Sequence, residues 1–490
     1  MSYKEANTAY NRAQSVLFHA KGTIMDKKRI TDTLAGFALS VNYADLPAEV
    51  IKAGKQSLLD SLGVMGAAAS LEPDCEPFIE YALENSRQDQ AGATIIGTGK
   101  RASPVMAAFA NGALIHALDY EDGHDRSKAH PNTAVIPVLL ALSQSGRSVS
   151  GRDFLLAMAV GSETVCRLKL ALMVDDLQNG WYSPAMFSAY GAVFAGARLL
   201  GMDAGRLQDA LSLCMTQIMM PGQAARSRNS SLRAVREAFS AKAAIVSLLL
   251  AGKGVMARMD EPFEGPLGLY HMMGKGSYDP AVIVDGLGKT WISSELRYKY
   301  WPCCGTTHGG VHALLSVLKE HPLSPEEVLD IHLTIDPVHL RVLEPYETKY
   351  RPGTLGAAKF SMPFCLALAL YYGNVRLDMF TEENLHNEKL LRLARKVTWE
   401  LRPGGADGLG DDHIRLRLCT TRAVFEKEIF KTPGSPDMPL SALQLEEKFL
   451  DCSRFFPHGI SAEQAGSVQK TLERAEAIPD MGEFIGSAFS

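Results

Sequence analysis

The sequence predicts a mainly α protein, with a large all-helical domain and a smaller α+β domain that we call the lid. Between residues 103 and 252 nearly every segment is rich in alanine and has apolar residues at helical spacing, which is typical of closely packed helices. After about residue 285 strand-like and helical segments alternate, and the chain is helical again from 436 onward. We therefore assign residues 28–284 and 436–490 to the helical domain and 285–435 to the lid.

The chain begins with an extension, residues 1–27. Its first 24 residues are polar and carry three basic side chains against the single acid Glu5. We interpret the extension as a disordered or surface segment, and an organellar presequence is the alternative interpretation. Residues 30–41 then show an amphipathic helical pattern.

Two further segments precede the alanine-rich region. Residues 43–70 have apolar side chains at helical spacing, and Asp45 is the expected helix cap. Residues 91–100 (AGATIIGTGK) predict a short extended piece.

A polar segment interrupts the alanine-rich region between His116 and His130, where the sequence reads HALDYEDGHDRSKAH. Ser103 and Pro104 fit the N-cap and first position of a helix that leads into this segment. Gly123 is expected to break the helix, and Thr133 is expected to cap the next one. Titratable side chains on a loop between buried helices favour proton-transfer chemistry, and an ordinary charged connection is the alternative.

Within the predicted lid, residues 290–301 have strand-like composition, 305–321 form a helical pattern and 328–336 another strand, so we expect a β-α-β unit. Helices are also expected at 360–373 and 387–397. Three further strands are predicted at 396–403, 413–421 and 423–430, and the glycine- and aspartate-rich residues 404–412 are the expected turn.

Composition and motifs argue against several classes of function. The chain has 490 residues, a net charge of −5 and no polybasic segment, so nucleic acid is an unexpected partner. Its apolar runs are shorter than the roughly twenty residues that cross a membrane. Eight scattered cysteines indicate a reducing compartment, and we expect a cytoplasmic protein. The common nucleotide, hydrolase and zinc-protease motifs are absent from the sequence, which favours acid/base chemistry without a cofactor.

Three side chains of the polar segment are catalytic candidates. His130 precedes Pro131, which favours extended backbone, and histidine suits general acid/base work near neutral pH. Asp119 and Asp122, three residues apart, could orient His130, contact the substrate or hold a metal with His124. We expect no metal, and we expect His116 to be packed within its apolar helix.

Several blocks of the chain resemble the MmgE/PrpD family, which includes 2-methylcitrate dehydratase, cis-aconitate decarboxylase and iminodisuccinate epimerase. The blocks are LPAEVIKAGKQSLLDSLGV (46–64), NGALIHALDYEDGHDRSKAHPNTAVIPVLLAL (111–142), GSETVCRL (161–168), NGWYSPAMFSAYGAVFAGARLLGM (179–202), KYWPCCGTTHGGVHALL (299–315) and KFSMPFCLALAL (359–370). The resemblance implies a helical domain, an α+β lid, a cleft between them, a homodimer and no cofactor. It also implies proton removal next to a carboxylate or imine of a small polycarboxylate.

The family's site pattern matches Asp119, Asp122 and His130 in the helical domain. Its lid pattern matches Lys299, Cys303 or Cys304, and His308. We expect Lys299, His308 and Cys304 to lie at the substrate, with the first two binding carboxylates.

The chain departs from the resemblance at two places. Tyr182 stands where family lyases often have histidine, and Arg233 or Arg236 falls near the usual lysine. Arginine holds a carboxylate well but does not deliver a proton. The leading hypothesis is a decarboxylase or dehydratase acting on an acid such as cis-aconitate or 2-methylcitrate, with Tyr182 catalytic and Arg233 binding substrate. An epimerase or isomerase that uses Tyr182 as second base, and an inactive binding protein, remain alternatives.

Overall fold

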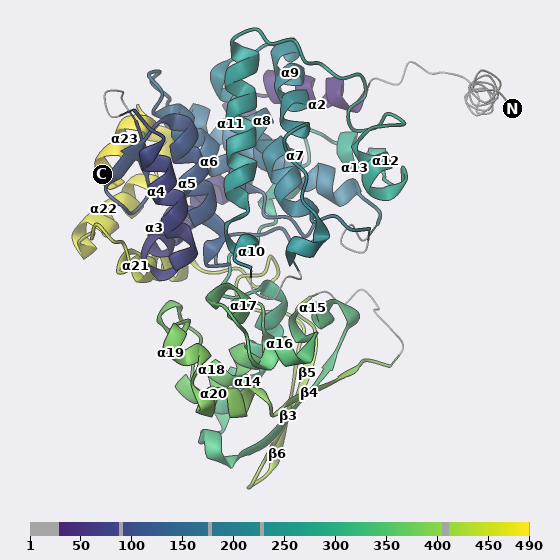
Figure 1. Ribbon diagram of the computed structural model, residues 1–490, viewed down its shortest axis with the longest axis vertical. Helices are drawn as coiled ribbons and strands as arrows, with labels where there is room; N and C mark the ends of the chain where they lie inside the picture. Colours follow the sequence, from purple (N-terminus) through teal and green to yellow (C-terminus); the bar gives the residue numbers. More distant parts are fainter. Residues whose placement is uncertain (1–28, 88–91, 175–178, 226–229, 404–410, 490) are drawn as a thin grey trace, which may run out of the picture.

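The computed structural model describes residues 29–87, 92–174, 179–225, 230–403 and 411–489. Figure 1 shows two bodies, a larger helical one and a smaller one that contains the main sheet. Each has its own apolar core. The extension at 1–27 lies outside the described residues, as does most of the turn expected at 404–412.

The core of the helical domain is built from helices that approach one another closely through small residues, as the alanine-rich sequence predicts. Gly161 on α7 faces Gly191 on α8, and a Cβ added to Gly191 would lie 2.7 Å from the Gly161 carbonyl oxygen. Only glycine permits this approach. The helices involved are α5 (Pro104–Ala117), α6 (Asn132–Ser143), α7 (Gly151–Ala171), α8 (Ser183–Leu200), α9 (Ala204–Met215) and α11 (Glu237–Gly252).

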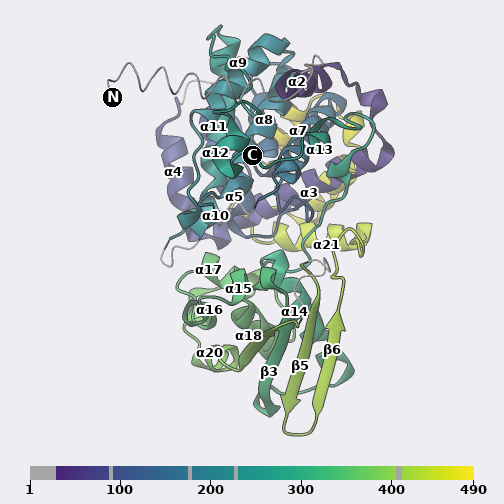
Figure 2. The same ribbon diagram turned by 90° about the vertical axis from the view of Figure 1, so that its right-hand side faces the viewer.

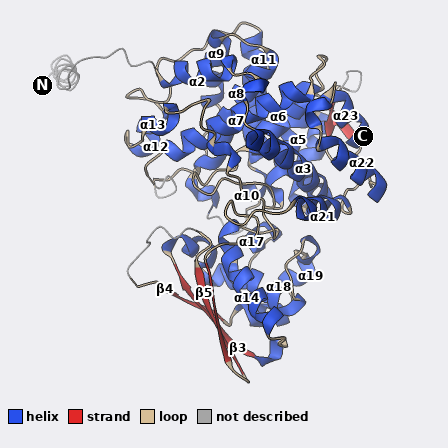
Figure 3. Ribbon diagram, turned by 180° about the vertical axis from the view of Figure 1, so that it is seen from behind, coloured by secondary structure: helices blue, strands red, loops and turns tan. Residues whose placement is uncertain are grey.

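Helices from both ends of the chain, and from residues 232–284, surround this core. They are α2 (Ile30–Ser40), α3 (Ala48–Leu71), α4 (Glu76–Glu84), α10 (Leu232–Val235), α12 (Leu269–Gly274), α13 (Pro280–Val284), α21 (Ala442–Ser453), α22 (Ala462–Leu472) and α23 (Met481–Phe489). The extended piece predicted at 91–100 is a hairpin of β1 (Ala93–Ile95) and β2 (Lys100–Ala102), and Figure 3 shows it beside α23.

The lid is a four-stranded sheet covered by helices. Its strand order is β4-β3-β5-β6, with β3 parallel to β4 and antiparallel to β5. The strands are β3 (Val328–Ile335), β4 (Val397–Leu401), β5 (Ile414–Thr420) and β6 (Val424–Ile429). Helices α14 (His308–Glu320), α18 (Met362–Tyr372) and α20 (Glu388–Ala394) pack beside it, and Figure 2 shows this layer next to the strands. The shorter lid helices are α15 (Leu340–Leu343), α16 (Tyr346–Tyr350), α17 (Leu355–Lys359) and α19 (Glu382–Leu385).

The strand predicted at 290–301 is wrong. This segment contains one short 3₁₀ turn, Ile292–Ser294, and then crosses between the two bodies. The Arg297 backbone exchanges two hydrogen bonds with Gly123 of the helical domain. The strand-like side chain Tyr298 is buried at the crossing and not in a sheet.

Two expected helix caps are also wrong. Asp45 lies in a 3₁₀ turn and its carboxylate accepts from the Asn42 backbone, whereas α3 begins after Pro47. Thr133 lies inside α6, which begins after Pro131, and its hydroxyl donates to the His130 carbonyl oxygen. Both errors are local, since the helices themselves form where the apolar pattern predicts.

Buried ion pairs join the two bodies. Lys359 of α17 donates to Glu72, which follows α3, at 2.8 Å, and both side chains are almost fully buried. Arg297 contacts Asp125 of the helical domain and Asp412 of the lid at 2.8 and 2.9 Å. Breaking a fully buried pair such as Lys359–Glu72 is costly, so this pair holds the lid against the helical domain. The Arg297–Asp125 pair is more exposed on its aspartate side. None of the described helices has the length and apolar character that crossing a membrane would need.

Candidate active site

The loop between α5 and α6 carries the candidate site. It leaves α5 through Asp119, whose φ of 48° is left-handed, and turns back through Lys128, whose φ is 55°. The His124 amide donates to the Ala129 carbonyl oxygen and closes the turn. Such backbone in non-glycine residues is uncommon and is typical of functional loops.

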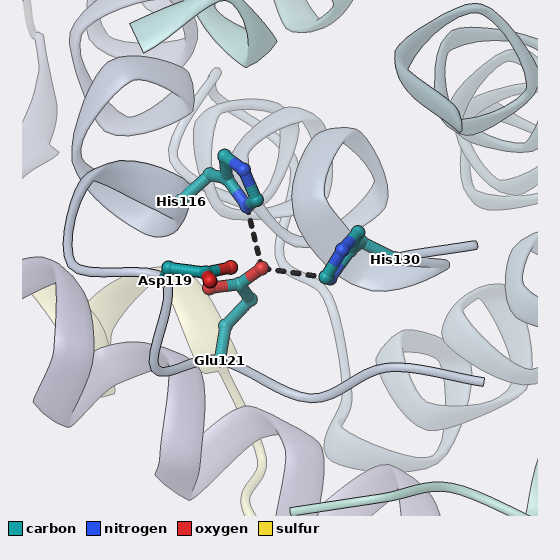
Figure 4. Close-up of side chains that lie close together, drawn as sticks. All are labelled: His116, Asp119, Glu121 and His130. Carbon is teal, nitrogen blue, oxygen red and sulfur yellow. Dashed lines mark hydrogen bonds and ion pairs between the residues drawn. The ribbon is translucent and has the colours of Figure 1, made fainter. Parts of the chain in front are cut away.

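Four side chains, three from this loop and one from α5, converge, as Figure 4 shows. They are His116, Asp119, Glu121 and His130, whose ligand atoms all lie within 4.8 Å of one another. Glu121 stands at the centre, because its Oε1 lies 2.6 Å from Nδ1 of His116 and 2.8 Å from Nδ1 of His130. From the sequence we expected His116 to be packed within its apolar helix, and Glu121 was not among the candidates.

The Glu121 carboxylate sets the tautomer of His130. Burial alone would raise the pKa of Glu121, but the hydrogen bond from His116 and the neighbouring Lys299 and His130 side chains lower it well below its usual value. An ionised carboxylate only accepts hydrogen bonds, so the imidazole donates its Nδ1 proton. The Nε2 atom of His130 is then the ring atom that can accept a proton, on a side chain that is 21% exposed while Glu121 is fully buried.

His116 is a neutral neighbour. Burial and the positive charge of Arg236 lower the pKa of His116 to about 3, although Glu121 opposes this. Its ring lies edge-on to that of His130, with centroids 4.9 Å apart. His116 therefore supports the position of Glu121 and His130 and adds no charge.

Lys299 reaches the same cluster from the crossing segment. Its Nζ donates to Asp119 Oδ1 at 2.6 Å and to the Asp119 carbonyl oxygen at 2.9 Å, and the lysine is buried. Burial alone would lower the pKa of Lys299, but Asp119 and Glu121 raise it. The ammonium expected to bind substrate is thus paired with Asp119 of the loop that carries the candidate site.

Asp122 points away from the cluster. Its Oδ2 accepts from Ser57 Oγ at 2.5 Å and from Asn132 Nδ2 at 2.6 Å. Burial, opposed by the Ser57 hydrogen bond, raises the pKa of Asp122 to about 7. The side chain therefore ties the loop to α3 and α6, and only its backbone carbonyl lies near His130 Nδ1, at 3.2 Å.

A second group of side chains, Tyr182, Arg233, Arg236 and Phe360, gathers near this cluster. The Arg236 guanidinium lies 4.4 Å from the centroid of the Tyr182 ring, and that of Arg233 lies 5.6 Å from it. Arg233 also stacks on Phe360 of the lid at 3.6 Å. Arg236 has Nε and Nη2 buried without a hydrogen-bond partner, although Nη2 lies 3.4 Å from Glu237. These arginines can hold a carboxylate.

The remaining lid candidates lie at different depths. His308 is fully buried and its Nε2 lies 3.1 Å from the Trp301 carbonyl oxygen, so it is packed inside the lid. Cys303 is also buried, with the Thr307 hydroxyl 3.0 Å from its sulfur. Cys304 is partly exposed, and burial and Asp119 raise the pKa of its thiol, opposed by Arg233. Of these three, Cys304 is the one near the arginines.

The four converging side chains also have the composition of a metal site. However, the Lys299 ammonium lies 2.6 Å from Asp119 Oδ1 and 3.9 Å from Glu121 Oε1. A second cation there would meet its repulsion. The donor set therefore fits an ion-paired proton-transfer site better than a metal centre. His124 lies apart from these four and bonds to Ser127.

Family models match most of the chain. The MmgE/PrpD N-terminal domain matches residues 32–281, and the MmgE/PrpD C-terminal domain matches residues 301–473. The chain belongs to the MmgE/PrpD family. The family match confirms the fold class, a large helical domain with a smaller α+β domain.

Curated relatives of this MmgE/PrpD protein carry one activity in their names. Cis-aconitate decarboxylase of Aspergillus terreus is 28% identical over 392 residues, 76% of this chain and 78% of that protein. Cis-aconitate decarboxylase-like protein oryM of Aspergillus oryzae is 26% identical over 484 residues, 93% and 96% of the two chains. Cis-aconitate decarboxylase of Homo sapiens is 26% identical over 437 residues, 86% and 87%.

Proposed function

We propose that this protein is a cofactor-independent lyase, a decarboxylase or dehydratase, that acts on a small di- or tricarboxylate such as cis-aconitate or 2-methylcitrate. The observation that carries the proposal is the Glu121–His130 contact of 2.8 Å, which leaves Nε2 of His130 free to exchange a proton. The curated relatives, named for decarboxylation of cis-aconitate, support the same reaction class.

In a dehydration, His130 Nε2 removes the proton next to a carboxylate, and the electron pair forms the double bond as hydroxide departs. In a decarboxylation, the carbon–carboxylate bond breaks, carbon dioxide leaves and the bonding electron pair stays on the substrate carbon framework. His130, which first takes up a proton from water at Nε2, delivers that proton to the substrate carbon. Both reactions develop negative charge beside a carboxylate. Arg233 and Arg236 would stabilise that charge, because a guanidinium binds a carboxylate through two hydrogen bonds.

Asp119 and Lys299 have a supporting role in this proposal. Their buried contact of 2.6 Å fixes the loop that carries Glu121. Asp122 fixes the other side of the loop through Ser57 and Asn132. The loop therefore presents His130 in one orientation, which proton transfer needs.

The second candidate is an epimerase, favoured by the position of Tyr182 beside two guanidinium groups. The phenol would return the proton to the face opposite His130. A binding protein without activity is the third candidate, in which the arginines hold a carboxylate and no proton moves.

The test is incubation of the protein with a panel of small polycarboxylates in deuterated water. A lyase changes the mass of its substrate by losing water or carbon dioxide, an epimerase only exchanges a proton, and a binding protein does neither. His130→Ala should lower the lyase rate by about two to four powers of ten. The matched control is His386→Ala, an exposed histidine of the lid, which should turn over like the parent.

We further propose that the protein works as a homodimer in the cytoplasm. The dimer rests on the family resemblance. Light scattering after size-exclusion chromatography tests it by measuring the molar mass of the eluted protein. A monomer would have the 53.2 kDa mass of the chain, and a dimer would have twice that mass.

A further inference from the structure

Two cations from different domains flank Phe360 of the lid. The Arg233 guanidinium of α10 lies 3.6 Å from the centroid of its ring. Lys349 of α16 donates a hydrogen bond from Nζ to the Phe360 carbonyl oxygen at 2.9 Å. Phe360 thus holds an ammonium and a guanidinium close together where the lid meets the helical domain.

Across the described ranges of the chain, no carboxylate forms an ion pair with Lys349 or Arg233. Arg233 Nε is buried without a hydrogen-bond partner. Arg236, which also faces Tyr182, is fully buried and has two nitrogen atoms without a hydrogen bond. Neighbouring like charges that are partly removed from water repel each other unless an anion lies between them.

The electrostatics of Lys349 agree with this geometry. Burial, with a further contribution from Arg233, lowers the pKa of Lys349 to about 8. Cys304, which lies near both cations, is the other group from the candidate site that faces this lysine. A bound carboxylate would relieve the repulsion and keep the ammonium charged.

We propose that Lys349 and Arg233 form a carboxylate subsite that is complete only when the lid lies against the helical domain, and that Lys349 thereby selects substrates whose carboxylate reaches the lid. This inference rests on the proposed function for the nature of the anion. Lys349 would thus join the arginines of the helical domain in binding substrate, although the sequence gave no reason to select it. A structural alternative is that Lys349 only ties α16 to the segment before α18.

Binding of tricarballylate, an unreactive tricarboxylate, tests the subsite by calorimetry on the full chain. Lys349→Met should raise its Kd at least tenfold, and Lys349→Arg should keep it within threefold of the parent value. Lys349→Gln is a second neutral variant in case methionine disturbs the packing. The matched control is Lys319→Met on α14, an exposed lid lysine, which should bind like the parent.

Several outcomes would overturn the proposal. One is unchanged tricarballylate affinity in Lys349→Met and Lys349→Gln with an unaltered melting temperature, as the structural alternative requires. Another is equal weakening by Lys319→Met, which would indicate general charge attraction. Failure of the parent protein to bind tricarballylate would also overturn it.

The same measurements separate this inference from the proposed function. His130→Ala removes the proposed base but leaves Lys349 in place, so tricarballylate binding to this variant should still weaken at least tenfold when Lys349→Met is added. Binding that depends on Lys349, without turnover of any polycarboxylate, would retain the subsite and reject the lyase. Turnover that depends on His130 but not on Lys349 would retain the lyase and reject the subsite.

Discussion

Glu121 and His130 share a contact of 2.8 Å in which the same carboxylate oxygen also accepts from His116 at 2.6 Å. One fully buried acid therefore orients two imidazoles, of which only His130 reaches the surface of the site. The arrangement resembles the acid of a catalytic triad, which holds the imidazole in the reactive tautomer.

Glu121→Gln should lower kcat by about two powers of ten or more, because the neutral amide no longer fixes the Nδ1–H tautomer of His130. It should also change the dependence of stability on pH. The folded-state pKa of Glu121 lies below the unfolded value, so its stabilisation is present above about pH 4.5 and is lost as the pH falls below that value. Thermal unfolding from pH 3 to 7 checks this, and an equal loss of stability at every pH would contradict it.

Asp122 should affect stability in the opposite direction from Glu121 as the pH changes, and Asp122→Asn tests this. The folded-state pKa of Asp122 is raised to about 7, so the parent protein loses stability as the pH rises from about 4 to 7 and this carboxyl ionises without water. Asparagine keeps an acceptor for Ser57 and Asn132 but does not ionise. The variant should therefore gain stability relative to the parent as the pH increases, measured by urea unfolding at pH 5 and pH 8. If the free energies of unfolding of variant and parent differ by the same amount at both pH values, ionisation of Asp122 does not cause the pH dependence.

The helices could be predicted because their causes are local. Ser103 and Pro104 mark the start of α5 in the sequence as in the structure, and the small residues around Gly161 predict close helix packing. The segment 290–301 could not be predicted. Its apolar and aromatic residues have strand-like composition, but they are buried at the crossing between two domains, which depends on the whole fold.

The cluster of the candidate site could be predicted from the sequence only in part, because it also depends on how the loop folds. His130 and Asp119 were identified from their residue types, and both lie in the cluster. Glu121 was passed over because nothing in its spacing shows that it reaches two histidines across the loop. Lys349 gave no signal at all, since its nearness to Arg233 arises only when the lid packs against the helical domain.

Removal of divalent metals by a chelator should leave turnover unchanged. His116, Asp119, Glu121 and His130 could hold an ion, but the Lys299 ammonium already supplies a positive charge 2.6 Å from Asp119. Dialysis against EDTA followed by an activity assay is the measurement. Loss of activity that one added divalent ion restores would replace the ion-pair account with a metal centre. Lys299→Met would then be expected to tighten metal binding.

Tyr182→Phe distinguishes the lyase from the epimerase, because it removes the hydroxyl and keeps the ring against Arg236, 4.4 Å away. In an epimerase that uses the phenol as second base, the variant should bind substrate normally and stop racemising it, as followed by chiral chromatography and proton exchange in deuterated water. In a lyase the phenol would hydrogen-bond a carboxylate or the departing group. Phenylalanine would then cost about 1–3 kcal/mol of transition-state stabilisation, and product would still form.

Tyr182→His extends this test. An imidazole at this position should raise activity toward cis-aconitate only if the surrounding arginines already hold the substrate as a lyase requires. Tyr182→Ala is the matched control for the ring, because it also removes the surface on which Arg236 and Arg233 stack. A harmless Tyr182→Phe combined with no gain from Tyr182→His would place the phenol outside the reaction. The arginines alone would then define that side of the site, and His130 would be left as its single proton carrier.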